Sequence, residues 1–142
     1  MADGTAPEKV VIVLATGLSA GRAANVAACL AAGVAAAAPT WAGWPLRDQG
    51  HIESVASSHL PIIVLCADPP RMAVLALKLG EPRPANCQLS LFPAYAQDIH
   101  DAETYRARHE RTQHGREALP GVAIAGSRTW VDRLAGSLPI LR

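Results

Sequence analysis

Residues 9–38 read KVVIVLATGLSAGRAANVAACLAAGVAAAA and join two elements of different pattern. Residues 9–14 form a continuous β-branched and aliphatic run, which is typical of a strand buried on both faces. Eleven alanines follow between Ser19 and Ala38, and Ser19 is a suitable N-cap for a helix that Pro39 ends. A buried strand that leads into a helix predicts an α/β domain.

The rest of the chain also alternates strands with helices. Further strands are predicted over residues 61–66, 87–92 and 121–125, and helices over residues 69–80, 101–115 and 129–136. Residues 39–60 are predicted to be a loop or short hairpin that covers the core with Trp41 and Trp44. This alternation predicts three layers, with a sheet between two layers of helices.

Length and charge limit the classes of protein to which the chain can belong. Its 142 residues suit a single domain over residues 9–142, preceded by a disordered lead over residues 1–8. A net charge of +1 predicts no strong field for nucleic acid or for an anionic membrane. The alanine-rich stretch has the length of a membrane span, but its glycines, Arg22 and Asn25 favour a buried helix of a soluble protein.

The cysteines and the first residues predict a cytoplasmic location. Residues 1–9, MADGTAPEK, lack the apolar segment of a secretory signal. Cys29, Cys66 and Cys87 fit no zinc or redox spacing, and we expect them to be small buried side chains.

The turn after the first strand is the first candidate for chemistry. Thr16, Gly17, Gly21 and Ala23 form the pattern T-G-x-x-x-G-x-A at a strand-to-helix junction. Such a turn can hold a nucleotide phosphate on free backbone N–H groups. The acidic residue expected about 20 positions further on is missing. We therefore expect a structural turn and no cofactor. The binding of an anion at the helix start, without a cofactor, remains an open alternative.

Polar side chains on two predicted helices are the next candidates. Arg22 and Asn25 lie three residues apart on one face of the alanine-rich helix, where Asn25 is either a satisfied core residue or a ligand contact. Over residues 101–117 four arginines are matched by four acidic residues, which predicts a solvated face. His109 and His114 lie five residues apart, off a common helical face, so no metal site is predicted.

Three segments together resemble a known bacterial family. They are KVVIVL with Leu18, Gly21 and Asn25, the strand PIIVLC at residues 61–66, and the ending GVAIAGSRTWVDRLAGSLPIL at residues 121–141. This combination resembles the family called domain of unknown function 2000, across nearly the whole chain. That family is similar to type 2 peptidyl-tRNA hydrolases, whose ending V-D-x-V-T-G-x-L resembles Val131–Leu138.

The resemblance implies a fold, a site and an assembly. It implies a mixed sheet of about four strands, of the peptidyl-tRNA hydrolase II type, and a homodimer. It also nominates Lys9, Arg22 and Asn25 as catalytic residues of a hydrolase that acts on an ester or amide bond. The acidic motif of those enzymes has no counterpart in FPAYAQDIHDAET, residues 92–104. We therefore favour a module that binds a small ligand or a partner in a cleft at the start of the first helix.

Overall fold

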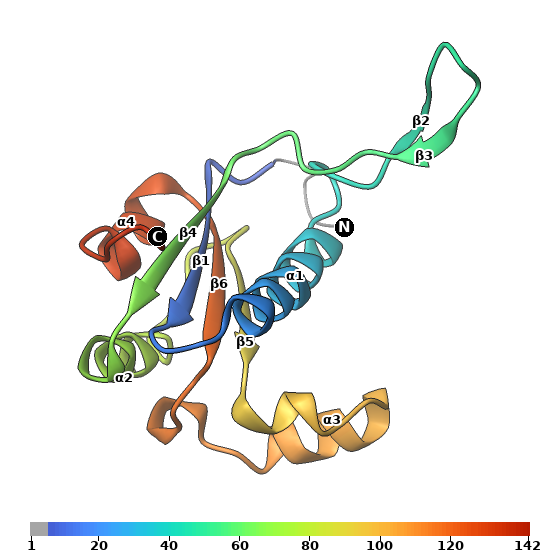
Figure 1. Cartoon of the computed structure of the whole chain (residues 1–142). Coiled ribbons are helices and arrows are strands. Elements are labelled where there is room, and N and C mark those ends of the chain that lie inside the picture. Colours follow the sequence, from blue (N-terminus) through green and yellow to red (C-terminus); the bar gives the residue numbers. More distant parts are fainter. Residues whose placement is uncertain (1–5) are drawn as a thin grey trace.

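The computed structural model describes residues 6–142 and shows an α/β fold around one four-stranded sheet (Figure 1). The elements in chain order are β1 Lys9–Ala15, α1 Ala20–Ala37, β2 Pro45–Arg47, β3 Glu53–Val55, β4 Ile62–Ala67, α2 Pro69–Lys78, β5 Gln88–Phe92, the 3₁₀ helix η1 Ala94–Gln97, α3 Ala102–Glu110, the 3₁₀ helix η2 His114–Arg116, β6 Gly121–Gly126 and α4 Arg128–Ala135.

The sheet is mixed, as expected, and its strand order is β4-β1-β6-β5. Strand β1 pairs in parallel with β4, with Val10 opposite Ile62. On its other side β1 pairs antiparallel with β6, with Lys9 opposite Gly126, and β6 pairs antiparallel with β5. Strands β1, β4 and β5 therefore point the same way, and their carboxyl ends lie at one end of the sheet.

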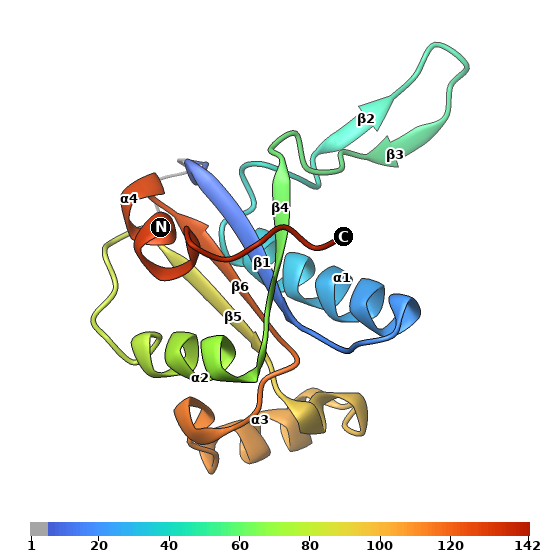
Figure 2. The same ribbon diagram turned by 60° about the vertical axis from the view of Figure 1, so that its left-hand side comes forward.

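Strand β1 separates two apolar layers because its side chains alternate between the faces of the sheet. Val10, Ile12 and Leu14 pack in the cluster that contains the buried side chains of α1. Val11 and Val13 pack in the cluster that contains those of α2 and α4. The helices thus cover both faces of the sheet (Figure 2), which confirms the predicted three layers.

Helix α1 is not buried, contrary to the expectation. Only Val26, Leu30 and Val34 are fully buried. A helix that packs on a sheet buries one of its sides, and most of the alanines of α1 lie on its other sides. By length and composition it is the one helix in the described part of the chain that could cross a membrane. One such helix is weak evidence for a membrane span, because the core helix of a soluble protein passes the same test.

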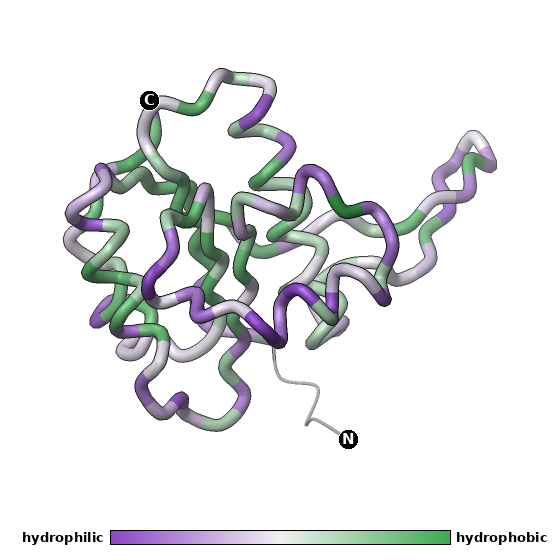
Figure 3. The backbone as a smooth tube through the Cα atoms, turned by 90° about the horizontal axis from the view of Figure 1, so that it is seen from below, coloured by the Kyte–Doolittle hydropathy of each residue, from purple (hydrophilic) through white to green (hydrophobic). Residues whose placement is uncertain are grey.

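Residues 39–60 contain the hairpin of β2 and β3, which extends away from the body of the molecule (Figure 1). Trp41 is fully buried against α1 and the sheet, as expected. Trp44 is 39% exposed at the base of the hairpin and does not cover the core. Figure 3 shows hydrophobic residues along the central strands and hydrophilic ones in the outer loops.

The C-terminal segment is part of the sheet edge. The Cys66 N–H donates to the Pro139 carbonyl at 2.9 Å, and the Leu141 N–H donates to the Val64 carbonyl at 2.9 Å. These bonds cover one half of strand β4, whose outer edge would otherwise be open. The extended ending predicted from the sequence is therefore a short antiparallel partner of β4.

Two further expectations are corrected by the structure. The polar helix predicted over residues 101–115 ends at Glu110, and the chain then turns back into η2. Of the three cysteines only Cys87 is buried, since Cys29 lies on the outer side of α1 and Cys66 lies on the edge strand.

The predicted disordered lead falls mainly on residues 1–5, which lie outside the described residues. Glu8, its last residue, is held at both ends: its N–H donates to the Gly126 carbonyl at 3.0 Å, and its carboxylate accepts from the Arg128 N–H at 3.1 Å.

Candidate functional site

The turn between β1 and α1 is joined to both neighbouring strands. The Ala15 N–H donates to the Pro120 carbonyl at 2.9 Å, and the Thr16 N–H donates to the Ala67 carbonyl at 3.1 Å. Gly17 has a φ of +87°, a conformation that side chains disfavour, and it reverses the chain. The Ser19 hydroxyl then caps α1 by accepting from the Arg22 N–H at 3.3 Å.

The turn between β4 and α2 lies beside it and is built differently. The Asp68 carboxylate accepts from the Arg71 N–H at 3.0 Å and caps α2. Pro69 and Pro70 occupy the first helical positions and have no N–H to offer. The start of α2 therefore presents a carboxylate and few donors. The first N–H groups of α1 have no acceptor within the helix, and they remain the donors of this region.

The chain leaves these two strands toward opposite faces of the sheet. Strands β1 and β4 are parallel neighbours, and α1 and α2 cover different faces. In open α/β sheets a crevice forms outside the carboxyl ends of such strands, and ligands bind there. The topology therefore selects the Thr16 turn as the candidate site.

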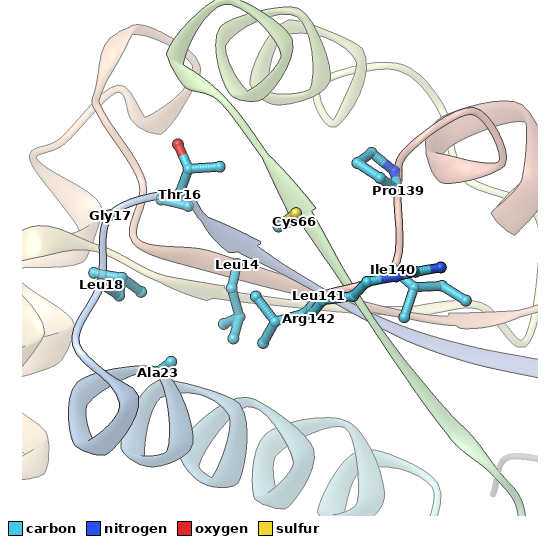
Figure 4. Close-up of a pocket in the computed structure, with 11 residues that line it drawn as sticks. Leu14, Thr16, Gly17, Leu18, Ala23, Cys66, Pro139, Ile140, Leu141 and Arg142 are labelled. Atoms are coloured by element: carbon cyan, nitrogen blue, oxygen red, sulfur yellow. The ribbon is translucent and has the colours of Figure 1, made fainter.

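A cavity of about 700 Å³ lies on the α1 side of this turn. Its lining comes from four segments: the end of β1 with the following turn, the first turn of α1, strand β4, and the C-terminal segment. Figure 4 shows Leu14 and Leu141 pointing toward α1, from which Ala23 points back. The lining is largely aliphatic, and Thr16, Cys66 and Arg142 are its members with polar side chains.

A second cavity of about 350 Å³ lies on the α2 side and shares Ala15 and Thr16 with the first. Met72 and Leu119 give it an apolar wall, and Arg116 and Glu117 lie at its polar side. The two cavities thus meet at the carboxyl end of β1. Sequence reasoning located the turn between strand and helix, and it missed the walls that Cys66, residues 115–119 and residues 139–142 supply.

Lys9 lies at the other end of β1. Its Nζ is 2.6 Å from the Asp132 Oδ1 of α4, and the Lys9 side chain is only 20% exposed. Ala15 is six positions after Lys9, a distance of roughly 20 Å along a strand. The structure therefore brings Lys9 to Asp132, another residue of the resemblance, and not to Arg22 or Asn25.

Arg22 and Asn25 lie on the outer side of the first two turns of α1, and neither lines the 700 Å³ cavity, to which this helix contributes Ala23. Both are exposed, which excludes the interpretation of Asn25 as a satisfied core residue. They share one face, as predicted. Gly21 is an ordinary helical residue, so the turn itself requires only Gly17.

Fold and crevice define an α/β protein with a candidate ligand site at the carboxyl end of two parallel strands. The chain belongs to the family described as protein of unknown function DUF2000, whose sequence profile matches residues 8–142. No curated protein matches the chain.

A solved structure, described as a protein of unknown function, Atu0240, from Agrobacterium tumefaciens strain C58, has a similar fold. The TM-score is 0.77 at 20% sequence identity, and the match covers 94% of this chain and 97% of the other. This likeness extends to the fold alone.

Proposed function

We propose that this protein is a binding module for a small amphipathic ligand, with an apolar body and one anionic or hydrogen-bonding group. The observation that carries the proposal is the pair of cavities that meet at Thr16. Ligand pockets of proteins have mainly apolar linings with a few placed polar groups, and this lining follows that rule.

The polar end of the ligand is assigned to the start of α1. The N–H groups of Ala20 and Gly21 and the positive end of the helix dipole favour an anion there. Arg22 lies on the same turn, and Arg142 lines the cavity. The apolar body then lies against Leu14 and Ala23, and the carboxylate of Asp68 disfavours an anion at the start of α2.

A fluorescent amphipathic anion, 1-anilinonaphthalene-8-sulfonate, tests this proposal, with octanoate as the competitor. Ala23→Trp fills the cavity with an indole and should weaken probe binding at least 10-fold. Ala24→Trp is the matched control, because Ala24 is exposed on the same helical turn and does not line the cavity. Arg22→Ser should weaken the anion several-fold and leave the wavelength of its emission unchanged.

Equal probe affinity in Ala23→Trp and Ala24→Trp would place the probe elsewhere and overturn the proposal. Circular dichroism and a urea titration verify that each variant folds. Ala23→Leu fills less space, and it replaces the tryptophan variant if that protein is unstable.

The hydrolase alternative, of the peptidyl-tRNA hydrolase type, remains a prediction. Lys9 contacts Asp132, and both belong to segments that carry the resemblance. However, a substrate would need to reach from Lys9 to Asn25 for these residues to act together. An assay on peptidyl-tRNA decides: Lys9→Ala and Asn25→Ala should each lower the rate about 10²-fold if they stabilise and orient the reacting group. Unchanged turnover in both would exclude that mechanism.

The homodimer also remains a prediction. The hairpin exposes Leu46, Ile52 and Val55 beyond the body of the molecule, and a second copy of the chain is one way to cover such side chains. Sedimentation velocity of the intact chain measures the assembly directly.

A further inference from the structure

Four aromatic rings from three segments, η1, α3 and η2, meet outside the cavities at Thr16. They are Tyr95 of η1, Tyr105 and His109 of α3, and His114 of η2. The ring centroids of His109 and His114 are 4.1 Å apart, and Tyr105 stacks on His109 at 6.1 Å. All four side chains are half-buried. The chain reverses after Glu110, which is why two histidines five residues apart become neighbours.

Both imidazoles direct a nitrogen at the same phenol oxygen. The Tyr95 hydroxyl lies 3.3 Å from the His109 Nδ1 and 2.6 Å from the His114 Nε2. A hydrogen bond lies along the lone pair or the N–H of an imidazole nitrogen, so both nitrogens point at one place. Two nitrogens and one oxygen that converge are three donors of a metal site.

The two distances from the Tyr95 hydroxyl can be compared with those between the ligands of a tetrahedral site. With metal–ligand bonds of about 2.0–2.1 Å, neighbouring ligand atoms are roughly 3.3 Å apart. The Tyr95–His109 pair already has this separation, and the Tyr95–His114 pair needs to open by well under 1 Å. An ion bound by all three atoms therefore requires the Tyr95 hydroxyl to move back from the two imidazole nitrogens that point at it.

We propose that Tyr95, His109 and His114 bind one late first-row divalent cation, and Zn²⁺ is the one best suited to a tetrahedral site. Imidazole nitrogen suits this ion, and water completes the coordination. In the described part of the chain no three His, Cys, Asp or Glu side chains are close enough to hold an ion, so the proposed site depends on the Tyr95 phenolate as its third protein ligand. The bond that forms is metal to phenolate oxygen, and the phenol proton leaves to solvent without any redox change.

The environment of the cluster shifts the pKa of two of the proposed ligands, His114 and Tyr95. Burial, and then the charge of His109, lower the pKa of His114. Burial raises the pKa of Tyr95, against the nearby Arg108, whose guanidinium lies 5.2 Å from the Tyr95 ring centroid. Metal ligands bind in their deprotonated form, so the ion displaces the phenol proton and its affinity should increase with pH.

Isothermal titration of the full chain with Zn²⁺ tests the site, with Mg²⁺ as the ion that should not bind. We expect one Zn²⁺ per chain, and at least 10-fold weaker binding in both His109→Gln and His114→Gln. His51→Gln and His100→Gln are the matched controls, since both histidines are exposed and lie outside the cluster. Absence of binding, or equal weakening in the controls, would overturn the proposal.

The variant Tyr95→Phe isolates the contribution of the phenolate to metal binding from that of the two histidines. Titrations in buffers of different ionisation enthalpy count the protons released on binding. The wild-type chain should release about one more proton than Tyr95→Phe, and its affinity should increase more steeply with pH. Equal proton release would exclude the phenolate as a ligand. If a histidine variant does not fold, the visible spectrum of the Co²⁺-loaded wild-type chain decides: tetrahedral bands support the site, and the spectrum of hydrated Co²⁺ overturns it.

Discussion

The two ends of strand β1 use their polar groups in different ways. At the amino end, Lys9 is paired with Asp132 of α4, and Glu8 binds the first turn of the same helix. At the carboxyl end, the turn at Thr16 lies between two cavities, and α1 and α2 diverge from it. One end is closed by side chains that satisfy each other, and the other leaves donors and apolar walls free for a ligand.

The difference follows from the directions of the chain. At the amino end β6 runs directly into α4, which folds back over β1 and closes that end. At the carboxyl end two connections leave on opposite faces of the sheet, and a crevice forms between them. We therefore expect substitutions at the amino end to change stability alone, and those at the carboxyl end to change binding as well.

The largest effects are expected where β6 has no room for a methyl group. A Cβ at Gly126 would lie 2.5 Å from the Cys87 Sγ, and one at Gly121 would lie 2.8 Å from a methyl carbon of Val26. Gly126→Ala and Gly121→Ala should each lower the free energy of unfolding in urea by about 1–3 kcal/mol. Gly21→Ala is the control, since a Cβ there meets nothing within 4 Å. Equal stability of all three variants would show that the sheet ends are not tightly packed.

A serine side chain caps a helix at each end of β1, so the contributions of the two caps to stability can be compared directly. The Ser127 hydroxyl accepts from the Trp130 N–H at the start of α4, and Ser19 does the same for Arg22 at the start of α1. Ser19→Ala should cost about 1 kcal/mol of unfolding free energy. Ser127→Ala should cost less, because Glu8 still accepts from the α4 backbone. Chemical denaturation measures both, and a larger loss at Ser127 would contradict the role of Glu8.

The pair of Lys9 and Asp132 should contribute less. The Asp132 side chain is 44% exposed, so solvent screens the attraction. A double-mutant cycle with Lys9→Met and Asp132→Asn should give a coupling of about 0.2–1 kcal/mol that decreases with added salt. Probe binding at the Thr16 cavities should not change. Loss of that binding in Lys9→Met would show that the two ends are functionally connected.

The smallest expected effect is a pH dependence confined to the carboxyl end. Burial first, and the charge of His109 second, hold the pKa of His114 below its ordinary value of 6.5, with Glu117 opposing them. The folded chain thus binds fewer protons than the unfolded chain near that pH, and stability decreases as the pH falls through about 6.5.

Hydrogen exchange measures this dependence locally, in the presence of a chelator. Between pH 7 and pH 5 the amides of α3 and η2 should lose protection beyond the intrinsic change of rate, and those of α4 should not. His114→Gln should remove the difference. An equal loss in α4 would indicate a global response and not one of the histidine cluster.

Local patterns in the sequence were sufficient for most of the elements. β1 and β6 follow from short apolar runs, and α1 begins directly after Ser19, the residue expected to cap it. These features depend on side-chain shape and on hydrogen bonds to near neighbours, which sequence displays. The exposure of Cys66 and Trp44 could not be predicted in this way, because it depends on which strand lies at an edge and on where a hairpin points.

The sequence by itself determined an α/β domain, the order of its elements and the turn at Thr16 and Gly17, since propensity and capping act over a few residues. Only the tertiary structure decided that Lys9 faces Asp132 and not Asn25, that the C-terminal segment walls a cavity, and that His109 and His114 meet at Tyr95. Each of these contacts joins segments through the packing of the sheet, and no local pattern records the partner across such a distance.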